Sequence, residues 1–286
     1  MKILVIDNSR SKRKSLNKSM NNFNDLEVKE IESFDDIPKL LDYALNNNFE
    51  LVIAAGGDGT MNRVINEAMN LKKPYRDRLM FSTLPCGKAN DLARRFNLSK
   101  NYNKSLNKIL IGKRVKLDII QVNNKYFITG GGFGLPVQVI KETERLNYLK
   151  TDKVYLYAVL KILLKGYNKL NLEIDGKREK DLMLLSIMNQ PFIGKRFHLT
   201  PNSKINDGYF NICAIKKGHS CFKDILVLQK VIKKSHLNKE WSKFDKLKKV
   251  NIKLDKEDYF IGDGELLEYS NNFNFKIIPQ ALNFIY

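Results

Sequence analysis

Short apolar runs alternate with amphipathic segments through the N-terminal part of the chain. The runs Ile3–Ile6 and Leu51–Ala55 are continuous, which is typical of parallel strands buried on both faces, and a third strand is expected over Met80–Leu84, which ends at Pro85. Residues 37–44 and 61–69, which lie between these runs, repeat their apolar positions at helical spacing, and a further helix begins after the third run. This alternation predicts a parallel sheet, and ligands of such sheets bind where the strands end.

The C-terminal part has a different pattern, in which short strands follow one another. Asn123-Asn124 and Asp175-Gly176 separate apolar segments and predict tight hairpin turns. Two stretches, 153–167 and 221–248, have helical periodicity instead. The expected strands are 115–119, 126–129, 170–174, 182–188, 209–215, 250–254, 259–261 and 273–278.

Together these patterns predict an α/β plus β fold. Residues 1–115 are expected to form a parallel α/β domain, and residues 116–286 a mostly antiparallel β domain. An arrangement in which the extreme C-terminus returns to the first domain stays open.

The composition narrows the class of partner. The 286 residues include 50 Lys and Arg against 31 Asp and Glu, so the net charge of +19 favours anionic partners: nucleic acid, phosphorylated small molecules or an anionic membrane face. The chain is 43% hydrophobic, which excludes a largely disordered protein. Cys86, Cys213 and Cys221 form no CxxC pair, so we expect neither a disulfide framework nor a zinc site. No apolar run has the length of a membrane span, and a cytoplasmic protein is expected.

The most informative motif follows the second apolar run. Gly56-Gly57-Asp58-Gly59-Thr60 lets backbone N–H groups approach a ligand at a helix start, which suits phosphate. An acidic side chain there fits a nucleotide that brings Mg²⁺ with it. A plain strand–helix turn in which Asp58 caps the helix is the alternative. Neither the P-loop nor the dinucleotide-binding pattern is present.

A second turn of this kind follows the third run, at Pro85-Cys86-Gly87-Lys88-Ala89-Asn90-Asp91. Asn90 or Asp91 could simply cap the following helix. Two acidic turns at successive strand ends are more informative than one, because both would face one crevice.

These motifs, with Asp263-Gly264-Glu265 near the C-terminus, resemble the diacylglycerol kinase catalytic-domain family, which includes bacterial soluble lipid kinases and sphingosine and ceramide kinases. The resemblance covers nearly the whole chain and includes Asn189, Pro201 and 206–208. GGDGT alone is shared with NAD kinases, but the second turn argues against them. The resemblance implies an NAD-kinase-like first domain, a C-terminal β-sandwich and a nucleotide cleft between them.

The resemblance also implies cofactors and roles. ATP and Mg²⁺ are the implied cofactors, and the hydroxyl group of a membrane lipid is the implied phosphoryl acceptor. Asp58, Asp91 and Asp263 are similar to an acidic cluster that holds Mg²⁺, and Asp263 or Glu265 would take the hydroxyl proton. An ordinary turn is the alternative for 263–265. The implied nucleotide-binding residues are Asn8, Gly56, Gly57, Asp58, Gly59, Thr60, Asn62, Lys88 and Asn90.

Three positions depart from the family pattern. The loop Asn8–Lys12 lacks the usual glycine and proline, so Arg10 or Lys12 would have to supply charge. Lys88 stands where threonine is usual, and Arg63 where glutamate is usual. All three departures add positive charge near the expected phosphate site, which leaves the choice of nucleotide open.

A second cation site is implied around Asp207, in the turn Asn206-Asp207-Gly208. It would use the Asp207 carboxylate with backbone carbonyls near Lys204 and Tyr209, which are hard-oxygen ligands suited to Mg²⁺ or Ca²⁺. A plain Asp-Gly turn is equally compatible with the sequence.

We therefore expect an ATP-dependent lipid kinase acting at the inner face of the membrane, with diacylglycerol as the favoured acceptor and no specific nucleic acid partner. The alternatives are a kinase of NAD or another small molecule, and a catalytically weak protein that binds anionic membrane or nucleic acid. Residues 230–249, rich in lysine with apolar residues between, could dock on an anionic leaflet or form a solvated helix. A homodimer stays open.

Overall fold

The computed structural model describes residues 1–8, 25–146, 154–237 and 239–286. Two compact units divide the chain: residues 1–119 with 280–286, and residues 120–279. The boundary expected at 115/116 falls inside one strand, β5, which runs across the division. Among the described residues, no helix is long and apolar enough to cross a membrane.

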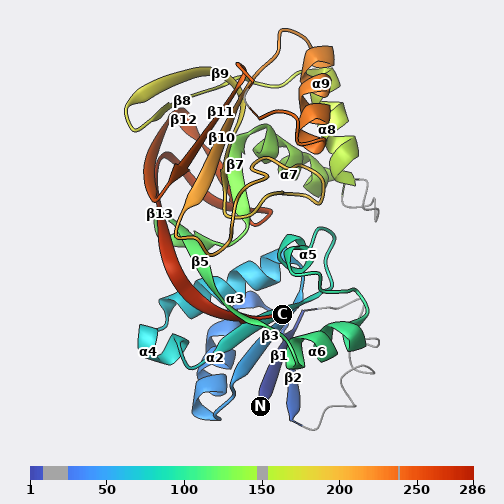
Figure 1. Ribbon diagram of the computed structural model, residues 1–286, viewed down its shortest axis with the longest axis vertical. Helices are drawn as coiled ribbons and strands as arrows, with labels where there is room; N and C mark the ends of the chain where they lie inside the picture. Colours follow the sequence, from blue (N-terminus) through green and yellow to red (C-terminus); the bar gives the residue numbers. More distant parts are fainter. Residues whose placement is uncertain (9–24, 147–153, 238) are drawn as a thin grey trace. The chain divides into compact units, whose positions relative to one another are not determined.

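The first unit is built on parallel strands (Figure 1). Their order is β13-β4-β3-β1-β2, where β13 contributes only its last residues and pairs Phe284 with Phe81 of β4. The elements are β1 (Ile3–Asp7), β2 (Leu26–Glu30), η2 (Phe34–Asp36), α2 (Ile37–Asn46), β3 (Leu51–Gly56), α3 (Asp58–Asn70), α4 (Lys73–Arg76), β4 (Met80–Pro85), α5 (Asp91–Arg95), α6 (Tyr102–Leu110) and β5 (Arg114–Val122).

Burial explains why these segments are strands. Every residue of β1 and β3 is buried, as expected of a parallel sheet covered on both faces. Helix α2 packs against α3, and α5 and α6 pack against β4. The strand β2 was not predicted. Among the described strands its partner is β1 alone, and it is half-buried. Its sequence, Leu-Glu-Val-Lys-Glu, therefore does not need the continuous apolar run of a central strand.

The second unit is mostly antiparallel, with strands in the order β11-β10-β9-β7-β12-β13. Its elements are β6 (Lys125–Phe127), β7 (Gly130–Gly134), α7 (Leu135–Arg145), α8 (Val154–Lys165), β8 (Leu170–Ile174), β9 (Lys177–Met188), β10 (Phe210–Lys216), α9 (Cys221–Ile232), β11 (Ser242–Leu247), β12 (Lys249–Gly262) and β13 (Glu265–Ile285). Both predicted hairpin turns are confirmed, since Asn123 and Asp175 have positive φ angles between paired strands.

Side chains of this sheet alternate between two cores. In β10, Phe210 and Ile212 point into a core built from the strands, whereas Cys213 and Ile215 point into a second core, which α7, α8 and α9 complete. The sheet is therefore buried on both faces in its middle.

Two expectations for this unit are wrong. The helix predicted over 221–248 ends at Ile232, where Lys234 takes a φ of 59° and Ser235 N–H donates to the Lys230 carbonyl. Further along, Ser242–Leu247 form β11, which pairs with the edge of β10, so the lysine-rich stretch is not one helix. The strands predicted at 250–254 and 259–261 are one strand, β12, whose pairing with β13 is irregular between Lys253 and Asp258.

Candidate active site

Three parallel strands of the first unit end side by side. Asp7 at the end of β1 lies beside Ala55 of β3, and Gly56 lies beside Pro85 of β4. Backbone hydrogen bonds continue past these ends, from Asn8 N–H to the Ala55 carbonyl at 2.9 Å and from Cys86 N–H to the Gly56 carbonyl at 2.8 Å. Both predicted turns therefore begin at one edge of the sheet, as the alternation of strands and helices predicted.

The two turns touch each other through their backbones. A Cβ atom built on Gly87 would lie 2.5 Å from the Cα atom of Gly57, which is far inside van der Waals contact. Asp58, the first residue of α3, uses its Oδ1 atom to accept a hydrogen bond from the Asp91 N–H at 2.7 Å. Because Asp91 begins α5, this bond caps the second helix with the carboxylate of the first turn.

The first turn is also joined to the end of β1. Thr60 lies in the first turn of α3, and a Cβ atom on Gly56 would meet its Oγ1 atom at 2.3 Å. The same Oγ1 atom accepts a hydrogen bond from Asn8 Nδ2 at 3.1 Å. The structure thus brings Asn8 and the Gly56–Thr60 turn together, as expected for two parts of one site.

Asn90 does not cap α5 with its side chain. It has a φ of 52°, and its Oδ1 accepts from Gly87 N–H at 2.9 Å while its Nδ2 donates to the Gly87 carbonyl at 2.7 Å. Asn90 therefore closes the turn from 87 to 90, which keeps Gly87 against Gly57. The helix-cap alternative is wrong for the Asn90 side chain.

The chemistry of this pair of turns suits Mg²⁺ held together with phosphate. Asp58 is half-buried and Asp91 is buried, and a hydrogen bond joins the Asp58 carboxylate to the backbone N–H of Asp91. Magnesium is usually held by one or two carboxylates with substrate phosphates and water completing its shell. No cluster of three or more Asp, Glu, His or Cys with metal-binding geometry occurs in the part of the chain that the structure describes. Asp58 and Asp91 are thus at most two carboxylate ligands, a number that fits a magnesium ion whose other ligands are phosphate and water.

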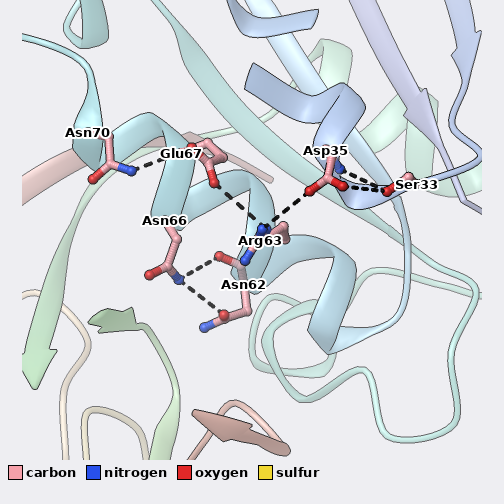
Figure 2. Close-up of polar contacts among 7 residues, drawn as sticks. All are labelled: Ser33, Asp35, Asn62, Arg63, Asn66, Glu67 and Asn70. Carbon is pink, nitrogen blue, oxygen red and sulfur yellow. Dashed lines mark hydrogen bonds and ion pairs between the residues drawn. The ribbon is translucent and has the colours of Figure 1, made fainter. Parts of the chain in front are cut away.

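Arg63 lies beside two acidic side chains. Figure 2 shows its guanidinium between two carboxylates, with Asp35 at 3.9 Å and Glu67 at 3.7 Å. The same view shows Asn66 Nδ2 donating to the carbonyl and to the Oδ1 of Asn62, at 2.9 and 3.0 Å. Asn62 is buried. Asp35 and Glu67 therefore offset part of the Arg63 charge, and a contribution of Arg63 to the phosphate site stays a prediction.

Lys88 is exposed at the tip of the second turn, and no ion pair or hydrogen bond holds its ammonium among the described residues. Arg10 and Lys12, the other expected sources of positive charge, lie outside the described residues. A pocket of about 320 Å³ adjoins the second turn, with Asn90, Arg94 and Lys100 in its lining. Its volume lies at the lower end of the range for ligand pockets.

In the second unit, Asp263 is held by three hydrogen bonds. It occupies the two-residue turn between β12 and β13 with a φ of 51°, followed by Gly264 at 83°. Its Oδ1 accepts from the Thr129 N–H and Oγ1 at 2.7 and 2.6 Å, and its Oδ2 accepts from Ile128 N–H at 2.9 Å. The carboxylate therefore anchors the turn to the segment before β7.

Asn189 binds the other side of that segment. Its Nδ2 donates to the Ile128 carbonyl at 2.9 Å, and its N–H donates to the Thr129 carbonyl at 3.0 Å. Thr129 was not predicted as a site residue. No local pattern marks it, because its partner Asp263 lies 134 positions away along the chain.

Glu265 follows this turn as the first residue of β13. Its side chain is exposed, but the surrounding protein desolvates it, and Glu144 of α7 and Asp263 add like charge. In that order, desolvation and the two carboxylates raise the pKa of Glu265 above 4.5. A carboxylate with a raised pKa is better matched to accepting a proton near neutral pH. Glu144 was not predicted either, since its effect depends on the packing of α7.

The Asp207 carboxylate, which is expected to hold a second cation, has two partners within the protein. The Oδ1 atom of Asp207 accepts from Tyr209 N–H at 3.2 Å, and its Oδ2 atom pairs with Lys246 Nζ at 2.9 Å. The ammonium groups of Lys246 and Lys248 also lie over the Tyr209 ring, at 4.6 and 4.9 Å from its centre. Lys204 is exposed. A lysine from β11 thus supplies the positive charge that a metal ion would have supplied.

Two family models match the chain. Residues 2–122 match the model described as "Diacylglycerol kinase catalytic domain", and residues 132–286 match the model described as "YegS C-terminal NAD kinase beta sandwich-like domain". The two models account for the parallel α/β unit and for most of the antiparallel unit, so the two-domain expectation agrees with them.

Individual proteins are also similar. A "Probable lipid kinase YegS-like" of Shewanella frigidimarina (strain NCIMB 400) is 29% identical over 261 residues, which cover 87% of this chain and 81% of that protein. A "Diacylglycerol kinase" of Staphylococcus aureus (strain JH9) is 32% identical over 182 residues, which cover 62% of this chain and 56% of that protein. The crystal structure of a diacylglycerol kinase from Bacillus anthracis str. Sterne superimposes with a TM-score of 0.76 at 20% identity, covering 100% of this chain and 96% of that one, and shows the fold.

Proposed function

Because this chain belongs to the family that joins a diacylglycerol kinase catalytic domain to a YegS C-terminal NAD kinase beta sandwich-like domain, we propose that it is an ATP-dependent lipid kinase. It transfers the γ-phosphoryl group of ATP to the hydroxyl group of a membrane lipid, and diacylglycerol, which would give phosphatidic acid, is the favoured acceptor. The observation that carries the proposal is the contact between the two turns through Asp58 and Asp91.

In this proposal the nucleotide phosphates bind over the first turn. The backbone N–H groups of Gly57, Asp58 and Gly59 stand at the start of α3, whose thirteen residues direct a positive partial charge to that end. Gly57 also packs so closely against the second turn that position 87 has no room for a side chain. Further contacts are assigned to Lys88, whose exposed ammonium is available to an anionic ligand. Asn8, Gly56, Thr60, Asn62 and Asn90 complete the proposed nucleotide site.

Asp58 and Asp91 would hold Mg²⁺ together with the phosphates. The ion would neutralise charge on the transferring phosphoryl group. Asp58 also keeps α5 in place through its bond to the Asp91 N–H, so the same carboxylate has a structural and a binding role. The metal role expected for Asp263 stays a prediction. Three protein donors bind its carboxylate oxygens, which favours a structural role for this side chain.

Glu265 is proposed as the proton acceptor. When the lipid oxygen bonds to the γ-phosphorus, the bond from that phosphorus to the β–γ bridging oxygen breaks, ADP leaves, and the hydroxyl proton passes to the Glu265 carboxylate. The raised pKa of Glu265 and its exposure support this role, whereas Asp263 positions the turn. The nucleotide cleft expected between the two domains stays a prediction.

Transfer of radioactive phosphate tests the proposal. The protein is incubated with γ-labelled ATP and Mg²⁺ together with diacylglycerol, other hydroxyl lipids, NAD, or no acceptor. We expect label in lipid and none in NAD. Label in NAD without label in any lipid would overturn the proposal in favour of a small-molecule kinase. Glu265→Gln serves as the matched control, because it should remove lipid labelling while nucleotide binding, measured by calorimetry, stays unchanged.

A further inference from the structure

Two helices of the second unit leave apolar side chains in solvent. Of the ten large apolar residues that are exposed among those described, six lie on α8 and α9: Leu156 at 38%, Tyr157 at 51%, Leu160 at 39%, Leu164 at 71%, Phe222 at 67% and Leu226 at 41%. The helices pack against each other, and Figure 1 shows them side by side. We call these six residues the α8–α9 face.

The face is a regular feature of helix geometry. Leu156, Leu160 and Leu164 repeat at four-residue spacing, so they share one side of α8. Ala158 and Ile162 are buried on the other side, in the core that the helices complete. An ordinary surface helix turns a polar side to water, whereas α8 is apolar on both sides. Solvent-exposed leucine at this density marks an interaction surface.

The exposed charges on α8 and α9 themselves are positive, and Glu142 of the neighbouring helix α7 pairs with Lys161 and also lies within electrostatic reach of Lys165. Lys165, Lys223 and Lys230 are exposed on the same two helices, and none of them forms an ion pair with an acidic side chain of the described residues. The only acidic residue in either helix is Asp224, which is buried. Its carboxylate accepts from the Tyr167 hydroxyl at 2.8 Å and from Gly218 N–H at 2.6 Å.

We propose that the α8–α9 face docks on an anionic lipid bilayer. Apolar side chains enter the interface between head groups and acyl chains, and lysines beside them are attracted to anionic lipid head groups. A second copy of this chain is a poorer occupant, because a two-fold contact would place the same unpaired lysines against each other. The proposal moves the membrane contact from residues 230–249, most of which form a turn and the edge strand β11, to the two helices.

The face is connected to the proposed acceptor chemistry inside one unit. Helix α7 packs against α8 and carries Glu144, one of the two carboxylates whose charge acts on Glu265. Docking through α8 and α9 therefore anchors the helices that support the turn bearing the proton acceptor. This inference rests on the proposed function for its biological sense, but the binding itself is measured without ATP.

Vesicle co-sedimentation of the full chain tests the docking. The probes are vesicles of phosphatidylglycerol mixed with phosphatidylcholine, and vesicles of phosphatidylcholine alone. We expect binding to the anionic vesicles that weakens with added salt, because exposed charges are screened. The double variant Leu164→Glu with Phe222→Glu should bind at least about tenfold more weakly, since it replaces the two most exposed side chains of the face with charges that anionic lipid repels.

The matched control is Ile111→Glu. Ile111 is 88% exposed, lies in the first unit and is not part of the face, so the same change of chemistry there should leave vesicle binding unchanged. Lys165→Gln with Lys223→Gln should weaken binding to anionic vesicles and leave the small binding to neutral vesicles unchanged. Circular dichroism verifies that each variant is folded, which is expected because all the substituted side chains are exposed.

Two outcomes would overturn the docking proposal. Equal vesicle binding by wild type and the Leu164→Glu, Phe222→Glu variant would show that the face is not the contact. A dimer of the wild type in light scattering that becomes a monomer in this variant would assign the face to a second copy of the chain.

Phosphorylation of a short-chain diacylglycerol dissolved in water separates this inference from the proposed function. Failure there by the wild type would count against the kinase activity alone.

Discussion

Asp58 and Asp91 are 33 positions apart in the sequence and are joined by a hydrogen bond of 2.7 Å between a carboxylate oxygen and a backbone N–H. The bond connects the turn after β3 to the turn after β4, and it satisfies one of the amide groups that the start of α5 leaves without a partner. One acidic side chain thus holds together the two turns that carry most of the proposed nucleotide contacts.

Substitution of Asp58 should separate its two roles. Asp58→Asn keeps an oxygen that accepts from Asp91 N–H, so the free energy of unfolding should change by less than about 0.5 kcal/mol. Asp58→Ala removes the acceptor and should cost about 1 kcal/mol, as loss of a helix cap does. Both variants should lose at least about a hundredfold in kcat, because both remove the charge proposed to hold Mg²⁺.

Urea unfolding and initial-rate kinetics measure the two effects. Asp42→Asn is the control, since Asp42 is exposed on α2 and distant in sequence from both turns. Wild-type activity in Asp58→Asn would contradict the role of Asp58 in binding Mg²⁺, and capping of α5 would then be its remaining role.

Lys88 and Arg63 offer a matched pair of cations. Lys88→Ala should weaken binding of a non-hydrolysable ATP analogue by about threefold, because an exposed ammonium loses most of its strength to solvent screening. Arg63→Ala should leave that affinity unchanged, since Asp35 and Glu67 already neutralise the guanidinium. Isothermal titration calorimetry compares the two. The same loss of affinity in both variants would mean that general charge, and not contact, governs nucleotide binding.

The pH dependence of the reaction should report Glu265. A proton acceptor must be deprotonated, so the rate should fall as pH falls through the pKa of Glu265, which lies above its ordinary value of 4.5. Glu144→Gln removes one of the neighbouring negative charges that raise this pKa. The acidic limb of the rate profile should therefore move to lower pH, by less than about one pH unit, while the plateau stays unchanged.

Initial rates with saturating substrates over a pH series give the profile. Glu142→Gln, on the same helix, is the control, because the Glu142 carboxylate pairs with Lys161 and does not act on Glu265. A profile that does not move in Glu144→Gln would assign the acidic limb to another group.

Because Lys246 pairs with Asp207, the contribution of the Asp207 loop to stability should not depend on a metal ion. Asp207→Ala removes the ion pair and the hydrogen bond to Tyr209 N–H and should cost about 1 kcal/mol of unfolding free energy. Lys246→Ala should cost about 0.5 kcal/mol, and the double variant should cost less than the sum, because the two residues act on each other.

Thermal unfolding in Mg²⁺ and in chelator checks this expectation. We expect the same melting temperature shift for Asp207→Ala in both solutions. If Mg²⁺ stabilises the wild type and Asp58→Asn but not Asp207→Ala, then the loop binds a cation after all.

The sequence by itself determined the local elements and the residue types of the site. Continuous apolar runs suffice to predict β1 and β3, because strands buried on both faces are mostly apolar, and β4 is predictable from its apolar residues although Ser82 and Thr83 are buried within it. The glycines of the two turns follow from what a strand–helix turn requires to approach an anion, and the acids fit a cation that is bound with that anion. The Asp175-Gly176 hairpin was predictable for a similar reason, since both residues tolerate a positive φ.

Only the tertiary structure decided the partners of these residues. The lysine-rich stretch after Ile232 has apolar residues at spacings compatible with a helix, and it becomes β11 because the edge of β10 supplies hydrogen-bond partners from a distant segment. Asp263 meets Thr129, and Arg63 meets Asp35, through contacts that no local pattern records. Periodicity predicts which side of a segment is apolar. Whether another segment covers that side, or leaves it in solvent as on α8, depends on which distant parts of the chain pack against it.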